Sequence, residues 1–217
     1  MTGNRIMYHV ACVCAAAGIA CSALCAAPDA GNIILPKPQL EKGRPLMQVL
    51  KDRKSTREFS GQPLSRQDLS NLLWAAFGIN RPETNGRTAP SAMNMQEIDG
   101  YVTLAEGLFL YEAKNNELKK IHGKDIRALT GKQGFVKDAA ANIVLVGDKA
   151  RLKNPDAQKY MPADAAFISE NIYLYCASEG LATVVRASFD KPELAKVMEL
   201  RPDQEIIFAQ TVGYPKK

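Results

Sequence analysis

The sequence predicts a single domain that contains both helices and strands, and three observations support this. The chain has 217 residues, which is about the length of one domain. Residues 164–179 predict a long helix whose apolar side chains cover more than one face, so we expect it to be buried on several sides, either centrally or against a second subunit. Three further segments have the composition and turn residues of a strand meander: 101–104, 108–112 and 117–121.

The remaining predicted elements are shorter. One helix is expected to start after Ser65, which predicts a reciprocal cap with Asp68, and to end at Gly78. A polar stretch over residues 80–93 is typical of a functional loop, with a plain mobile connection as the alternative. Further helices are predicted over 46–51, 125–129 and 191–200, and further strands over 141–146, 181–185 and 205–212.

Composition and charge are those of a globular chain that binds an anion. Hydrophobic residues make up 46% and charged residues 24% of the sequence, and the net charge is +5. The tight basic groups lie only at residues 51–57 and at Lys216 and Lys217. No helix-turn-helix or RNA-binding signature accompanies them, so we expect an anionic cofactor or surface as the partner and no nucleic acid.

The N-terminus has the three-part layout of a secretory signal peptide. Arg5 precedes an uncharged run rich in Ala and Cys over residues 10–27, and small residues at 24–26 offer a cleavage site. We therefore expect residues 1–27 to be a signal peptide and the protein to be exported, either to the periplasm or as a secreted protein.

Two alternatives to simple cleavage stay open. The apolar run could remain as a membrane anchor, although it is at the short end of what spans a bilayer. Acylation at Cys21 or Cys25 would give a lipid anchor, although the residues before them fit a lipoprotein signal poorly. After cleavage we expect an extended arm over residues 28–45, a domain over 46–217, and no membrane span.

Leader cleavage would leave few reactive side chains. One cysteine, Cys176, and one histidine, His122, remain. We therefore expect no intramolecular disulfide and no metal site, and we expect His122 to be exposed or structural. With no candidate catalytic side chain, the chemistry of an enzyme of this sequence would come from a bound cofactor.

The segment Arg53-Lys54-Ser55-Thr56-Arg57 predicts a phosphate-binding site. It places two guanidinium groups four residues apart with a hydroxyl midway between them. Guanidinium groups bind phosphate oxygens bidentately, and the Ser55 hydroxyl can fill the gap between them. A solvated basic stretch after a short helix is the alternative. No Walker loop and no G-x-G-x-x-G fingerprint is present, so the sequence does not support a P-loop or Rossmann site.

Five segments in this order resemble the nitroreductase family of flavin-dependent oxidoreductases, particularly its compact members similar to SagB-type dehydrogenases. The resemblance runs from about Leu46 to Tyr214. The segments are 53–57 (Arg-Lys-Ser-Thr-Arg), 90–94 (Pro-Ser-Ala-Met-Asn), 131–134 (Gly-Lys-Gln-Gly), 179–183 (Glu-Gly-Leu-Ala-Thr) and 212–215 (Val-Gly-Tyr-Pro).

The resemblance implies an α+β fold with a central mixed or antiparallel sheet flanked by helices. It also implies a homodimer with the long buried helix at its interface and two FMN molecules, each in a cleft between the subunits. In that pattern Arg53, Ser55 and Arg57 take the flavin phosphate and nearby ribityl oxygens. The remaining implied contacts are Pro90, Ser91, Ala92 and Asn94 of the partner subunit on the isoalloxazine, Gln133 at the pyrimidine edge, and backbone amides of Val185, Arg186, Ala187 and Ser188 near N5 and O4.

The sequence departs from the family pattern in two places. Larger relatives often have an acidic residue and a glycine at the positions of Ala187 and Ser188. We therefore expect this chain to prefer a different substrate or to contact the flavin more weakly here. Relatives also commonly place basic residues well beyond the last core strand. Either Lys216 and Lys217 replace those basic residues at the phosphate, or the phosphate pocket is more open.

The first functional hypothesis is an exported FMN oxidoreductase that works by ping-pong hydride transfer through flavin N5. The donor would be NAD(P)H, a protein, or a substrate dehydrogenated directly, since NAD(P)H is not abundant outside the cytoplasm. The acceptor would be an electron-poor molecule such as a nitroaromatic or a quinone. A flavin-binding or interaction protein without turnover is the alternative, and a peripheral protein whose basic patches meet anionic lipid is a third reading.

Overall fold

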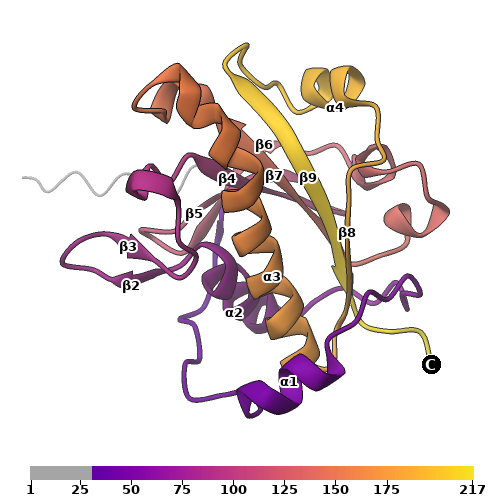
Figure 1. The fold of residues 1–217 in the computed structure, drawn as a ribbon. Helices are drawn as coiled ribbons and strands as arrows, with labels where there is room; N and C mark the ends of the chain where they lie inside the picture. The colour runs from indigo at the N-terminus through magenta and orange to yellow at the C-terminus, as the bar shows by residue number, and fades with distance from the viewer. Residues whose placement is uncertain (1–30) are drawn as a thin grey trace, which may run out of the picture.

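The computed structural model describes residues 31–217, so the predicted signal peptide and the first residues of the arm lie outside the described part. Its centre is a seven-stranded sheet in the order β1-β6-β5-β4-β7-β9-β8, in which every neighbouring pair is antiparallel (Figure 1). The strands are β1 (Ile33–Ile34), β4 (Ile98–Leu104), β5 (Gly107–Glu112), β6 (Glu117–His122), β7 (Ala141–Asp148), β8 (Ala182–Arg186) and β9 (Gln204–Gly213). The predicted meander is confirmed as β4, β5 and β6.

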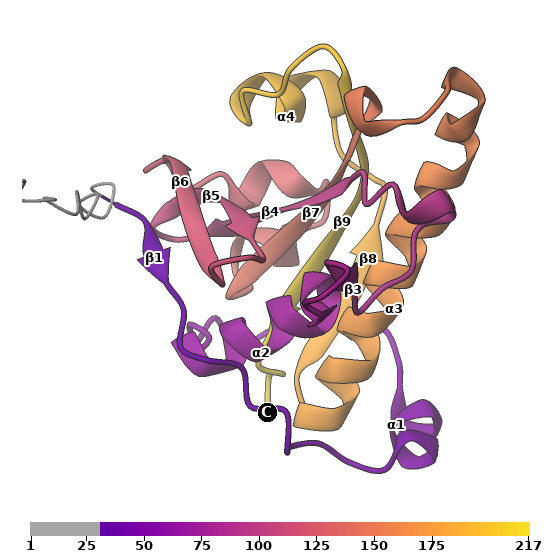
Figure 2. The same cartoon turned by 90° about the vertical axis from the view of Figure 1, so that its left-hand side faces the viewer.

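Helices cover both faces of this sheet (Figure 2). The α-helices are α1 (Leu46–Asp52), α2 (Arg66–Phe77), α3 (Met161–Glu179) and α4 (Lys191–Val197). Strand β7 is buried along its whole length, and its alternate side chains point to opposite faces. Ile143 and Leu145 pack in the core under α2 and α3, whereas Val144 and Val146 pack with α4 on the other side. The α+β prediction, with helices around a central sheet, is confirmed.

The long predicted helix is α3, which crosses one face of the sheet diagonally (Figure 1). It ends at Gly180, whose φ of 71° is the left-handed conformation that glycine adopts most easily. Ile172 and Cys176 are fully buried against the sheet, while Phe167 on the outer side is 49% exposed. The described chain therefore covers one side of α3 and leaves apolar surface on the other.

Helix α2 is capped at its start and contacts the arm. The Ser65 hydroxyl accepts a hydrogen bond from the Asp68 amide, as a cap requires, but the Asp68 carboxylate accepts from the Ser65 and Tyr214 hydroxyls, so the cap is not the reciprocal backbone box that the sequence predicts. In the arm, Leu35 is buried, and the Pro36 carbonyl accepts from Ser70 of α2. The arm thus has an extended, docked course.

Three predicted elements differ from the structure. The expected helix at 125–129 is a short 3₁₀ turn, η2 (Arg127–Thr130). The stretch expected to be a loop contains a small hairpin, β2 (Ile79–Arg81) and β3 (Gly86–Arg87), followed by the turn η1 (Ala92–Asn94). Helix α4 is shorter than expected because Glu199 adopts a left-handed φ of 57°, which stops helical propagation. Among residues 31–217, no helix is long and apolar enough to cross a membrane.

Candidate functional site

Tyr173 of α3 organises the basic segment that the sequence singles out. The Arg53 guanidinium lies over the Tyr173 ring, 5.3 Å from its centroid. The Tyr173 hydroxyl lies 2.8 Å from the Ser55 hydroxyl and accepts a hydrogen bond from the Val185 amide at 3.0 Å. A buried tyrosine normally satisfies its hydroxyl in this way. One side chain therefore fixes Arg53, Ser55 and the edge strand β8 relative to one another.

The chain end runs beside the same segment. The Lys216 amide donates to the Glu58 carbonyl at 3.2 Å, and Phe59 and Pro215 form an isolated β-bridge. Within residues 31–217, Arg53, Arg57 and Lys216 form no ion pair with a carboxylate. These cations are therefore not neutralised by a carboxylate of the described chain, and such groups attract a polyvalent anion.

Arg186 is a structural brace, because its side chain points into the protein. It donates from Nη1 to the Thr130 carbonyl, and from Nη2 to Asn142 Oδ1 at 2.9 Å, and its guanidinium lies 5.8 Å from the centroid of the Phe135 ring. Burial lowers the pKa of this guanidinium to about 10. The Arg186 side chain therefore joins the end of β8 to the 130–135 segment and is not available to a ligand.

The 131–134 segment brings Gln133 to the same end of β8. The Lys132 amide donates to the Ser188 carbonyl at 2.9 Å, so the two predicted contact segments touch. Gly131 packs closely against Arg186 and Gln133. A Cβ atom at this position would lie 2.1 Å from Arg186 Nη1 and 3.0 Å from Gln133 Oε1. Gln133 Oε1 is buried and accepts no hydrogen bond from the described residues. It is therefore an acceptor that a ligand N–H could satisfy.

Not all the predicted backbone donors at 185–188 are free. Strand β8 is at the sheet edge, pairing on one side with β9. On its other side, the Thr183 carbonyl accepts a hydrogen bond from the Thr56 amide, and the Val185 amide donates one to the Tyr173 hydroxyl. Arg186 pairs with Ala209 of β9, and because backbone groups alternate along an antiparallel strand, its amide faces β9. The prediction that this turn offers amides to a ligand therefore stays open only for Ala187 and Ser188.

The 90–94 segment lies apart from the cradle formed by Arg53, Ser55 and Arg57. The Ala92 amide donates to Asp164 Oδ2 at 2.9 Å, which places the segment beside the N-terminal half of α3 (Figure 1). Tyr173, which orders the cradle, lies nine residues further along the same helix, or about 13 Å along its axis. Within one chain, Pro90, Ser91, Ala92 and Asn94 do not meet the cradle.

Sequence reasoning missed three residues that order these segments: Tyr173, Asp164 and Glu97. A tyrosine among the apolar side chains of the long helix was a usable signal, because its hydroxyl needs a partner when buried. No local pattern could have paired Asp164 with Glu97, because they are distant in sequence and meet only through the packing of α3.

Comparison with known proteins agrees with this arrangement. A family model described as Nitroreductase family matches residues 50–214. The chain belongs to the nitroreductase family. The crystal structure of a candidate nitroreductase from Ralstonia eutropha JMP134 is 43% identical, with a TM-score of 0.81, and the match covers 86% of this chain and 90% of that one.

Two further proteins show lower sequence identity to this chain. A candidate nitroreductase of Methanocaldococcus jannaschii is 25% identical over 177 residues, which are 76% of this chain and 88% of that protein. A candidate nitroreductase from Desulfovibrio desulfuricans, solved in complex with FMN, shares the nitroreductase fold at 20% identity and a TM-score of 0.60, covering 80% of this chain and 88% of that one.

Proposed function

We propose that this nitroreductase-family chain is an FMN-dependent oxidoreductase. The observation that carries the proposal is the cradle beside β8, where the Arg53 guanidinium and the Ser55 hydroxyl lie against Tyr173, and where neither Arg53 nor Arg57 pairs with a carboxylate among residues 31–217. The membership in the family and the presence of FMN in one protein of this fold support the choice of ligand.

The residues present fit FMN. Arg53 and Arg57 offer forked donors to a phosphate, and the backbone of Lys216 lies beside that of Glu58, which follows Arg57 in the chain. The orphan acceptor Gln133 Oε1 suits the N–H of a pyrimidine ring. Both ends of the ligand would thus find partners within one continuous surface along β8.

When bound, the flavin would supply hydride transfer at N5, in a ping-pong cycle between a reduced donor and an electron-poor acceptor such as a nitroaromatic or a quinone. The chain's own residues would hold and orient it. His122 Nε2 lies 3.0 Å from the Val197 carbonyl, and Cys176 is fully buried with a thiol whose pKa is raised by burial. Neither side chain is placed to act as a base or nucleophile.

We also propose a homodimer, because the predicted contact segments are separated within one chain. The outer side of α3 and the neighbouring helix α1 expose the large apolar side chains Phe167, Leu46, Met47 and Leu50. Two copies joined through this surface by a two-fold axis would bring the 90–94 segment of each subunit toward the cradle of the other. This arrangement would complete a site that one chain leaves in two halves.

The proposed location is outside the cytoplasm, which bears on the electron donor. NADH and NADPH, a protein donor and a directly dehydrogenated substrate remain the three candidates. N-terminal sequencing of the mature protein tests the export proposal, with a start near residue 28 expected and an intact Met1 against it.

Removal of the two cradle arginines tests the cofactor. Each charge-assisted contact is worth about 1.5–3 kcal/mol, so Arg53→Ala or Arg57→Ala should weaken FMN binding roughly ten- to a hundredfold. Arg66→Ala is the matched control, because Arg66 is an exposed arginine at the start of α2 that pairs with Glu106. Stoichiometric FMN in the double cradle variant would refute the phosphate role.

A turnover assay distinguishes the proposed enzyme from a flavin-binding protein without turnover. Anaerobic mixing with NADH or NADPH, followed by an acceptor, should reduce and then reoxidise the bound flavin. Reduction without turnover on any acceptor would favour a flavin-binding protein.

A further inference from the structure

We propose that Glu97 is a positioning residue: its neutral carboxyl group donates a hydrogen bond to Asp164, and this carboxyl pair holds the 91–94 segment in place. The effect on the segment is independent of any ligand, whereas its consequence for flavin binding rests on the proposed function.

Burial requires a partner for the Glu97 carboxyl. Glu97 is 0% exposed, and among the described residues neither of its carboxyl oxygens accepts a hydrogen bond from a donor. An ionised carboxylate in such a place is strongly disfavoured, whereas a protonated one can donate. Asp164 is 3% exposed and is the side chain that faces Glu97 from α3. Burial is the largest cause that raises the pKa of Glu97 to about 7, and the hydrogen bond and charge of Asp164 act in the same direction.

The pair acts on a backbone that needs to be held. Met93, Asn94 and Gln96 each have a φ of 52°, the left-handed region that residues other than glycine rarely adopt. Asp164 holds this segment through the Ala92 amide at 2.9 Å. Without that contact, the strained turn would lose the anchor that joins it to α3.

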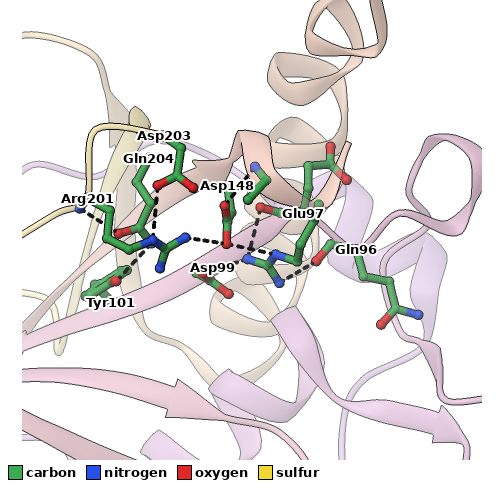
Figure 3. A network of polar contacts seen from close by, with 10 residues as sticks. Gln96, Glu97, Asp99, Tyr101, Asp148, Arg201, Asp203 and Gln204 are labelled. Carbon is green, nitrogen blue, oxygen red and sulfur yellow. Dashed lines mark hydrogen bonds and ion pairs between the residues drawn. The ribbon is translucent and has the colours of Figure 1, made fainter. Parts of the chain in front are cut away.

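Cations also bind the backbone of this segment and of the residues that follow it. Lys153 Nζ donates to the Met93 carbonyl at 2.9 Å, and Arg151 donates to the carbonyls of Gln96 and Glu97 at 2.9 and 3.2 Å. In Figure 3 the Glu97 carboxyl points away from the Asp148 side chain, toward which the ion pairs of this region converge. The cations therefore bind the backbone of the segment and not the Glu97 carboxyl.

Within the described part of the chain, the charged groups around Glu97 form no ion pair with its carboxyl group. Arg151 pairs with Asp99 at 2.6 Å and with Asp148 at 3.3 Å, and Arg201 also pairs with Asp148 at 2.9 Å. The positive charge of Arg151 is therefore shared by two other carboxylates. Loss of the Glu97 proton would place two negative charges in contact, and like charges in contact repel.

A movement of the Asp164 side chain would relieve this repulsion. The Asp164 side chain lines a cavity of about 200 Å³, so it has room to move away from Glu97. Such a movement would release the Ala92 amide and loosen the turn. The folded structure raises the pKa of Glu97 from 4.5 to about 7. The form in which the segment is anchored to Asp164 is therefore favoured at low pH, and it loses this advantage as the pH rises from 4.5 to about 7.

Hydrogen exchange of the FMN-free protein tests the proposal. After correction for intrinsic exchange rates, protection of the Ala92 amide should fall at least about tenfold between pH 5 and pH 8, with the decline complete near pH 7. Glu97→Gln keeps a donor to Asp164 but cannot ionise, so its protection should not change with pH. Glu83→Gln, an exposed glutamate of the neighbouring hairpin turn, is the matched control and should behave as the parent protein does.

The same pH dependence in the parent protein and in Glu97→Gln would overturn the proposal. Should that variant fail to fold, the carboxyl carbon resonance of Glu97 in the parent protein decides: a midpoint near pH 7 supports the pair, and one near pH 4.5 refutes it. Because neither measurement needs a flavin, a failure of FMN binding would overturn the proposed function and leave this result standing.

Discussion

Tyr173→Phe is the sharpest perturbation of the cradle, because it removes one oxygen and leaves the ring under Arg53. The lost hydroxyl contacts Ser55 at 2.8 Å and the Val185 amide at 3.0 Å. Each hydrogen bond is worth about 1 kcal/mol net, and an amide left unpaired costs about 1–3 kcal/mol. We therefore expect the free energy of unfolding to fall by about 2 kcal/mol.

Two assays measure this substitution. Thermal unfolding should show a melting temperature lower by about 4–8 °C, the shift that about 2 kcal/mol gives in a chain of this length. Titration with FMN, followed by quenching of flavin fluorescence, should show affinity weaker by roughly tenfold, because Ser55 loses its fixed orientation. Tyr160→Phe at an exposed position is the matched control. If Tyr173→Phe matched the parent protein in both assays, Tyr173 would not organise the site.

Other perturbations test separate parts of the account. Arg186→Met should lower the free energy of unfolding by about 3 kcal/mol in denaturant titration, because the carbonyl of Thr130 and Oδ1 of Asn142 lose a buried charged donor; unchanged stability would contradict the bracing role. Cys176 should react with a thiol reagent only after unfolding, because it is fully buried and its thiol pKa is raised by burial; rapid labelling of the native protein would contradict its placement. Phe167→Glu should convert the proposed homodimer to monomers in light scattering, and a dimer that persists would place the interface elsewhere.

Much of the fold follows from local pattern in the sequence. Three strands bounded by turn residues predicted β4 to β6, and the mostly apolar run at 141–146 predicted the fully buried β7. These signals are reliable because side-chain periodicity reports directly on which face is buried. The short turn at Arg127–Thr130 and the hairpin at 79–87 were misjudged, because short elements carry few residues of pattern and depend on contacts with the rest of the fold.

The site was only partly accessible from sequence. The spacing of Arg53, Ser55 and Arg57 predicted a phosphate cradle, with a solvated basic stretch as the alternative, and this stays a prediction. In the part of the chain that the structure describes, neither guanidinium group has a carboxylate partner. The inward course of the Arg186 side chain could not be foreseen, because it depends on the acceptors that Thr130 and Asn142 supply from distant segments. Packing, not pattern, decided which polar groups were already satisfied.

The visible absorption spectrum of the purified mature protein, recorded during titration with FMN, tests the central claim most directly. We predict a yellow protein that saturates at one flavin per chain, with an absorption band displaced from that of free FMN. A colourless protein whose addition leaves the spectrum of free FMN unchanged would contradict the account.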